Sequence, residues 1–204
     1  MSKRTVGVLG MQGAFQKHLD AIRACGHEAL WVRDRDEVEQ VEALILPGGE
    51  STTVGKLLDR WGLIEPVCRR AGEGMPLFGT CAGMIVMART LEAETGQPRL
   101  RLMDLVVRRN AYGRQVDSFE TDLSLPCLGE EPFRGVFIRA PMVTEVGEGV
   151  AVLGRHEDGI IFARQGNLLT AAFHPELTDD LRVHQYFLRM IDESSARLYP
   201  PQGA

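Results

Sequence analysis

The sequence predicts one α/β domain on an open mixed, mainly parallel sheet with helices on both faces. The first half alternates short apolar runs with amphipathic stretches, whereas the second half is a series of strand-like runs that predict antiparallel hairpins. The 204 residues, 44% of them hydrophobic, suffice for one sizeable core. We expect a single domain over residues 1–194 and a poorly ordered tail over 195–204, because the sequence ends in Tyr-Pro-Pro-Gln-Gly-Ala.

Four short apolar runs in the first half predict strands: residues 5–9, 27–32, 43–46 and 75–78. Helices are expected between them and after the last: residues 13–25, 51–62, 64–71, and one that opens at Cys81 or Ala82. The first carries Phe15, Leu19 and Ile22 at helical spacing, and Ser51 is expected to cap the second. The acidic segment between residues 32 and 43 is expected to form a turn.

Six further strand-like runs fill the second half: residues 102–108, 116–125, 135–139, 150–155, 160–165 and 168–173. Asp158-Gly159 and Gly166-Asn167 separate the last three and are typical of tight hairpin turns. A final helix is expected over residues 179–194.

Composition excludes several classes of protein. The net charge of −5, with no run of Lys or Arg, argues against a nucleic-acid surface. No segment approaches the roughly 18 apolar residues of a membrane span, so no membrane partner is expected. The four cysteines are far apart in sequence, form no CxxC pair and follow no export signal, so we expect a cytoplasmic protein with reduced thiols.

Cys81 is the first candidate for chemistry. The segment Gly79-Thr-Cys-Ala-Gly83 fits the nucleophile-elbow pattern G-x-S-x-G with cysteine in place of serine. Gly79 would tolerate unusual backbone angles, and Gly83 would let the helix pack close to neighbouring strands. At a helix N-terminus the thiol would be favoured as thiolate. The alternative is an inert cysteine packed in a buried turn.

A cysteine nucleophile needs a base and a group that orients the base. The segment Ala171-Ala-Phe-His-Pro-Glu-Leu177 offers His174 and Glu176 directly after an apolar run. The alternative is a surface turn with an incidental histidine and glutamate. The remaining histidines are expected at surface or capping positions: His18, His27, His156 and His184.

The segment Leu46-Pro-Gly-Gly-Glu-Ser-Thr-Thr53 offers bare peptide groups between a strand and a helix. The N–H of Gly49, with that of Ala82, would form an oxyanion hole. A turn without chemistry is the alternative. His174-Pro-Glu176 has the H-x-E spacing of zinc deaminases but lacks their downstream Pro-Cys-x-x-Cys, so no metal site and no cofactor are expected.

Together, the PGG loop, the GxCxG elbow and the HPE segment resemble a class I, triad-type glutamine amidotransferase domain. Further stretches resemble the family of glutaminase subunits of bacterial pyridoxal 5′-phosphate synthase, the PdxT family. They are Gly7-Val-Leu-Gly-Met-Gln-Gly13, Gly48-Gly-Glu-Ser-Thr-Thr53, Arg109-Asn-Ala-Tyr-Gly-Arg-Gln-Val-Asp-Ser-Phe-Glu120, Phe137-Ile-Arg-Ala-Pro141 and Phe173-His-Pro-Glu-Leu-Thr178.

The resemblance implies a glutaminase domain with Cys81, His174 and Glu176 as a catalytic triad. It also implies a set of residues that line the L-glutamine site: Gly48, Gly49, Glu50, Arg109, Ile138 and Arg139. The family's partner is a (β/α)8-barrel synthase in a large ring assembly. That synthase receives the ammonia for pyridoxal 5′-phosphate (vitamin B6) biosynthesis, and the isolated glutaminase is poorly active.

Two other functions remain open at this point. The same triad would serve a glutaminase with another ammonia acceptor, or a γ-glutamyl hydrolase. A non-catalytic α/β protein with Cys81 as a redox sensor is the alternative of another class. It leaves the PGG loop and the His-Pro-Glu segment unexplained.

Overall fold

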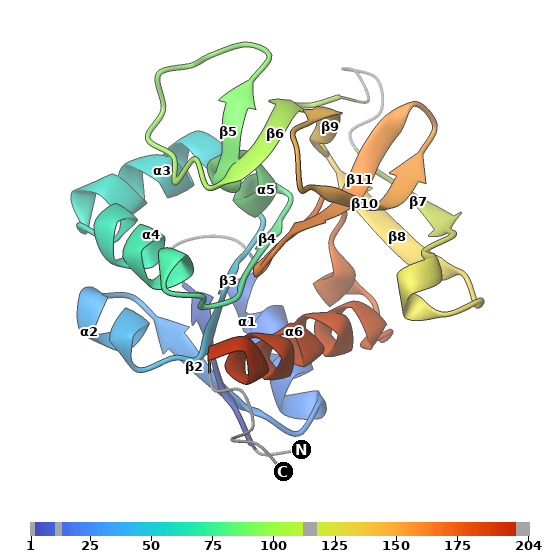
Figure 1. The fold of residues 1–204 in the computed structure, drawn as a ribbon. Helices are drawn as coiled ribbons and strands as arrows, with labels where there is room; N and C mark the ends of the chain where they lie inside the picture. The colour runs from blue at the N-terminus through green and yellow to red at the C-terminus, as the bar shows by residue number, and fades with distance from the viewer. Residues whose placement is uncertain (1–2, 11–13, 112–117, 199–204) are drawn as a thin grey trace.

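The structure is a computed structural model that describes residues 3–10, 14–111 and 118–198 (Figure 1). From one edge to the other, its main sheet contains β2 (Glu28–Val32), β1 (Thr5–Leu9), β3 (Ala43–Leu46), β4 (Leu77–Thr80), β12 (Leu168–Ala171), β11 (Gly159–Gln165), β9 (Met142–Val146), β6 (Met103–Arg108) and β5 (Ala88–Leu91). β10 (Ala151–His156) pairs with β11, outside this path. A separate two-stranded sheet consists of β7 (Ser118–Leu123) and β8 (Phe133–Ile138).

The two halves of the chain pair their strands differently, as expected. β1 to β4 are joined by parallel pairs, and β12 continues this parallel block beside β4. β10, β11 and β12 form consecutive antiparallel hairpins. Their turns lie at Glu157-Asp158, one residue before the expected Asp158-Gly159, and at the expected Gly166-Asn167. The predicted mixed sheet with hairpins in the second half is therefore confirmed.

Helices cover both faces of the parallel block (Figure 1). α1 (Phe15–Ala24) and α6 (Arg182–Leu198) lie on one side, and α2 (Arg35–Glu39), α3 (Ser51–Arg60) and α4 (Ile64–Gly72) lie on the other. The short α5 (Ala82–Met87) follows β4. Two single turns of 3-10 helix complete the described elements: η1 (Pro126–Leu128) and η2 (Pro175–Leu177).

Several predicted boundaries were wrong. The acidic segment forms α2 rather than a turn, because Asp34 caps it by accepting a hydrogen bond from the Glu37 N–H. β5 and β9 were not predicted; β5 follows α5 without a break. The final helix begins at Arg182 and continues to Leu198, beyond the expected end at residue 194. Residues 199–204 of the expected tail lie outside the described residues.

One hydrophobic cluster joins the parallel block to the hairpins. It contains the aromatic side chains of both halves, among them Phe78, Phe133, Phe162, Phe173 and Phe187. Burial of each such side chain stabilises the fold by about 1.5–3 kcal/mol. The cluster therefore fixes how the strands of the two halves lie together.

Two histidines lie inside this core, between α1 and α6. His18 and His184 are both fully buried, and His18 Nδ1 lies 3.0 Å from His184 Nε2. The expectation of surface or capping positions was wrong for this pair. Burial lowers the pKa of His18 despite the nearby Glu176 charge, and burial together with His18 lowers the pKa of His184 to about 3.

The lowered pKa of His184 predicts that acid destabilises the protein. Between pH values of about 6.5 and 3 the unfolded chain binds a proton at His184 that the folded chain excludes, so stability is lost as pH falls. For this one group the free energy of unfolding should fall by about 2 kcal/mol from about pH 7 to pH 5.

The variant His184→Gln keeps an N–H donor toward His18 but does not titrate. Urea unfolding should show that it loses about 2 kcal/mol less than the wild type over the same pH range. Above about pH 7.5 the two stability curves should run parallel. Equal acid sensitivity of the two proteins would contradict the assignment.

Candidate active site

Three neighbouring strands end at the same edge of the sheet. β4 pairs in parallel with β3 on one side and β12 on the other, with Gly79 opposite Leu46 and Thr80 opposite Ala171. The loop after β3 carries Gly48, Cys81 follows β4, and His174 comes shortly after β12. The parallel pairing therefore brings together three segments that are far apart in sequence, at the sheet edge where open α/β folds bind ligands.

Cys81 occupies a strained turn between β4 and α5. Its φ of 48° and ψ of −101° are rare for a residue with a Cβ, and its N–H is held by the Ala171 carbonyl at 2.8 Å. The residue is 7% exposed, and its Sγ faces the Ile138 carbonyl oxygen at 3.9 Å. The thiol is thus buried but faces a pocket. An inert cysteine packed in the core would not need access to a pocket.

Both elbow glycines are required by close backbone approach. A Cβ at Gly83 would lie 2.2 Å from the Leu46 carbonyl oxygen, which confirms the predicted tight packing of the helix against a strand. A Cβ at Gly79 would lie 2.6 Å from the Gly83 carbonyl carbon. Gly79 is not among the residues with positive φ, so the prediction that it supplies unusual backbone angles was wrong. The strained residue is Cys81 itself.

His174 and Glu176 form a buried pair, not a surface turn. His174 Nδ1 donates to Glu176 Oε1 at 2.8 Å, and the side chain of Glu176 is fully buried. The backbone N–H of His174 donates to the Val136 carbonyl of β8 at 2.8 Å. On its other side the ring faces Gly48, where a Cβ would come within 2.4 Å of His174 Cε1. Gly48 therefore leaves the space that the imidazole occupies.

The charges in this row of side chains stabilise one another. Burial opposes protonation of His174, but its hydrogen bonds and charge interactions with Cys81 and Glu176 outweigh burial and raise its pKa to about 10. Burial alone would raise the pKa of Glu176, yet its electrostatic interaction with His18 and the hydrogen bond from His174 hold it below its usual value. Glu176 is therefore a carboxylate that only accepts hydrogen bonds.

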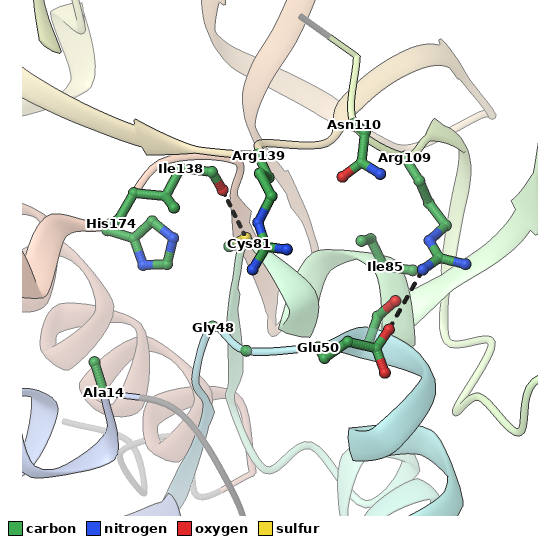
Figure 2. A pocket seen from close by; sticks show the side chains of 12 residues that line it. Ala14, Gly48, Glu50, Cys81, Ile85, Arg109, Asn110, Ile138, Arg139 and His174 are labelled. Carbon is green, nitrogen blue, oxygen red and sulfur yellow. Dashed lines mark hydrogen bonds and ion pairs between the residues drawn. The ribbon is translucent and has the colours of Figure 1, made fainter. Parts of the chain in front are cut away.

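A pocket of about 270 Å³ opens in front of Cys81 (Figure 2). The structure brings together around it eight of the predicted site residues: Gly48, Gly49, Glu50, Cys81, Arg109, Ile138, Arg139 and His174. Of the two others, Glu176 lies behind His174, and Ala82 is the first residue of α5, directly after Cys81.

Four further residues line the pocket and were not predicted: Ala14, Ser51, Ile85 and Asn110. Three of them could have been found from the sequence. Ser51 and Asn110 directly follow the predicted Glu50 and Arg109, and Ile85 lies one helical turn after Cys81. Ala14 follows residues 11–13, which lie outside the described residues.

One wall of the pocket carries an ion pair. Arg109 Nη2 lies 3.4 Å from Glu50 Oε1. Glu50, and not the predicted Ser51, caps α3, and it accepts hydrogen bonds from the N–H groups of Thr52 and Thr53. Burial opposes the ionisation of Glu50, but these hydrogen bonds lower its pKa to about 2. The wall therefore presents both a fixed negative charge and a positive charge at neutral pH.

Backbone strain is concentrated around the pocket. Five non-glycine residues in the described part of the chain have positive φ, and three of them line the pocket: Cys81, Asn110 and Arg139. Such conformations cost about 1–3 kcal/mol each and persist where the surrounding structure enforces them. Arg139 and Asn110 directly follow Ile138 and Arg109, so the strain lies in the segments that carry both pocket arginines.

Parts of the expected motifs fall on residues that the structure does not describe. These are residues 11–13 of the segment from Gly7 to Gly13 and residues 112–117 of the segment from Arg109 to Glu120. The four cysteines are described and form no disulfide. Among the described residues, no group of three or more His, Cys, Asp or Glu is arranged to hold a metal ion, and no helix there has the length and apolar character to cross a membrane.

Known proteins resemble this chain over most of its length. The subunit PdxT of pyridoxal 5′-phosphate synthase from Pelotomaculum thermopropionicum is 59% identical over 183 residues, which cover 90% of this chain and 93% of the relative. PdxT from Moorella thermoacetica is 54% identical over 186 residues, which cover 91% of this chain and 98% of the relative. A crystal structure of a glutamine amidotransferase has a TM-score of 0.87 and 49% identity, and the match covers 92% of this chain and 98% of that one.

The family match spans almost the whole described fold, from β1 to α6. Residues 8–193 match the SNO glutamine amidotransferase family. This range contains the Cys81 elbow, the loop with Gly48 and Gly49, and the His174–Glu176 pair. The chain therefore belongs to the SNO glutamine amidotransferase family.

Proposed function

We propose that this protein hydrolyses L-glutamine to L-glutamate and ammonia through Cys81, and that the ammonia passes to a synthase subunit that makes pyridoxal 5′-phosphate. One observation carries this proposal: a thiol, an imidazole and a carboxylate lie in a row, and the thiol end faces a pocket with charges of both signs. The names of the similar proteins, subunits of pyridoxal 5′-phosphate synthase, supply the destination of the ammonia.

The pocket wall suits a free amino acid. The Glu50 carboxylate would bind the substrate ammonium group, and the guanidinium of Arg109 or Arg139 would bind the substrate carboxylate. Gly48, Gly49 and Ile138 would line the path of the side-chain amide toward Cys81. The pocket of about 270 Å³ lies just below the usual range for drug-sized ligands, as expected for a substrate of this size.

The first half of the reaction forms a thioester. The Cys81 thiolate attacks the amide carbon of glutamine, and the carbonyl electrons move to the oxygen, which the N–H groups of Gly49 and Ala82 would stabilise. The His174 imidazolium donates its proton to the amide nitrogen as the C–N bond breaks, so ammonia leaves. Glu176 keeps the imidazole in the tautomer that presents Nε2 to the thiol and the leaving group.

The second half releases glutamate. Neutral His174 removes a proton from water, and the resulting hydroxide attacks the γ-glutamyl thioester carbon. The C–S bond breaks, Cys81 recovers the thiolate, and His174 returns to its protonated form. Neither half needs a metal or a cofactor, since every proton and electron pair comes from the side chains, water and substrate.

The ammonia acceptor in this proposal is a (β/α)8-barrel synthase subunit that forms a large ring. It joins the ammonia to a pentose phosphate and a triose phosphate. The glutaminase is expected to be poorly active until the synthase docks, so that ammonia is made only where it is used.

The variant Cys81→Ala tests the reaction. Glutamate release should be measured with the synthase subunit present, and Cys81→Ala should lower it by at least about 1000-fold because no thioester forms. The wild type without the synthase should be far slower than the complex. Equal activity of wild type and variant would end the enzyme assignment, and equal activity with and without the synthase would remove only the coupling.

Gly48→Ala tests the geometry around the base. Its methyl group would occupy the space of His174 Cε1, so the imidazole must move, and a displacement of this kind lowers kcat by about 100-fold. Gly72→Ala is the matched control, since a Cβ there meets nothing within 4 Å at the end of α4. Wild-type activity in Gly48→Ala would show that this contact does not hold the base.

A further inference from the structure

The buried row of side chains does not end at Glu176. His18 Nε2, on α1, lies 3.3 Å from Glu176 Oε2, and both side chains are fully buried. Glu176 Oε2 has no hydrogen-bond partner within the described residues, although Oε1 is satisfied by His174. A buried carboxylate oxygen requires a donor, and His18 Nε2 faces it.

The protonation states around His18 follow from the groups that cannot donate. Glu176 is ionised and only accepts, so a proton on His18 must be on Nε2. The same nitrogen lies 3.3 Å from Thr80 Oγ1, a hydroxyl that can accept its hydrogen bond. His18 Nδ1 is then an acceptor, and His184 must donate its Nε2–H across the 3.0 Å contact. His184 Nδ1, buried without a partner in the described chain, is left unprotonated.

The opposite tautomer of His18 is unfavourable. With the proton on Nδ1, the Nε2 lone pair would face the Glu176 carboxylate at 3.3 Å, and the two would repel each other inside a region that excludes water. His184 therefore donates to His18, and the Nε2–H of His18 places the positive end of its dipole beside Glu176 Oε2, as a polar contact at 3.3 Å. From the other side, His174 donates to the second oxygen of the same carboxylate.

We infer that His18 is a positioning residue for the proposed glutaminase reaction, with His184 fixing its tautomer. His18 would hold the outer oxygen of Glu176 so that the inner oxygen stays aligned with His174 Nδ1–H. This role rests on the proposed function, because it acts through His174 and Glu176. His18 does not touch the pocket in front of Cys81 and does not itself react.

Three substitutions in α1 distinguish a role of His18 in positioning Glu176 from a role in packing the core. His18→Leu fills the site without a donor, and His18→Gln keeps an N–H near the position of Nε2. Ile22→Val is the control, because Ile22 is fully buried on the same helix, one turn further on. Glutamate release is measured for each with the synthase present, together with thermal unfolding.

His18→Leu should lower kcat by about 10- to 100-fold, the effect expected when one close polar contact to a buried charge is lost. KM should change by less than about twofold, since the pocket is untouched. His18→Gln should recover most of kcat, and Ile22→Val should behave as the wild type. Without the donor the Glu176 carboxylate is less stable, so the acid limb of the kcat–pH profile should move to higher pH in His18→Leu only.

The other charged groups near Glu176 are unchanged in these variants. They are His174 after β12, His184 on α6, and Lys17, Asp20 and Asp179, which line a neighbouring surface hollow together with Glu176. A shift of the acid limb in His18→Leu alone therefore reports on the donor that was removed.

Three outcomes would overturn the inference: wild-type kcat and pH profile in His18→Leu, no recovery in His18→Gln, or an equal loss in Ile22→Val. An inactive wild-type complex would instead refute the proposed function. If the variants do not fold, histidine-selective ¹⁵N NMR of the wild type tests the assigned tautomers directly. It should show His18 and His184 protonated at Nε2 and His174 carrying a proton on Nδ1, and a His18 proton on Nδ1 would refute the assignment.

Discussion

The contact between α5 and β3, where Gly83 lies against the Leu46 carbonyl, determines how close the three active segments come to one another. A side chain at position 83 would push α5 away from the strand, since even a Cβ would lie 2.2 Å from that oxygen. The elbow would move with the helix, and with it the Cys81 thiol. The same close approach recurs at Gly48, which faces the His174 ring. Backbone packing without side chains therefore sets the distance between nucleophile and base.

Around this backbone frame, the buried polar groups satisfy one another. An isolated carboxylate in the core would be strongly unfavourable, and Glu176 is tolerated there because His174 and His18 face its two oxygens. The helices that cover one face of the sheet thus have a second role besides burying apolar surface. α1 carries His18, and α6 carries His184, so the packing of these helices and the orientation of the base depend on each other.

The sequence was most informative where chemistry requires specific residue types at fixed spacing. β3 matched its predicted bounds, and Cys81, His174 and Glu176 were found from the elbow and from the His-Pro-Glu segment. Local pattern was insufficient where the outcome depends on three-dimensional packing. Helical spacing does not tell which neighbour a buried face meets, so the sequence led to surface or capping positions for His18 and His184.

Two other errors have separate causes, a choice between neighbouring capping residues and a strand that depends on its partners. Ser51 and Glu50 can both cap a helix, and only the fold shows that the Glu50 carboxylate reaches two N–H groups. β9 begins directly after Pro141 and pairs with β6 and β11, so its formation depends on residues distant in sequence.

The small sheet of β7 and β8 has a mechanical consequence. It shares no strand pairing with the main sheet in the described chain, yet β8 holds the His174 N–H through the Val136 carbonyl and provides Ile138, whose carbonyl faces the thiol. A displacement of this ribbon would break no ladder of the main sheet, but it would disturb the packing of Phe133 and Phe137 on Phe173 and pull on the imidazole. A force applied to this ribbon would therefore reach the base by two routes, through the Val136 peptide group and through the rings packed on Phe173, so strain in the small sheet is transmitted directly to the active site.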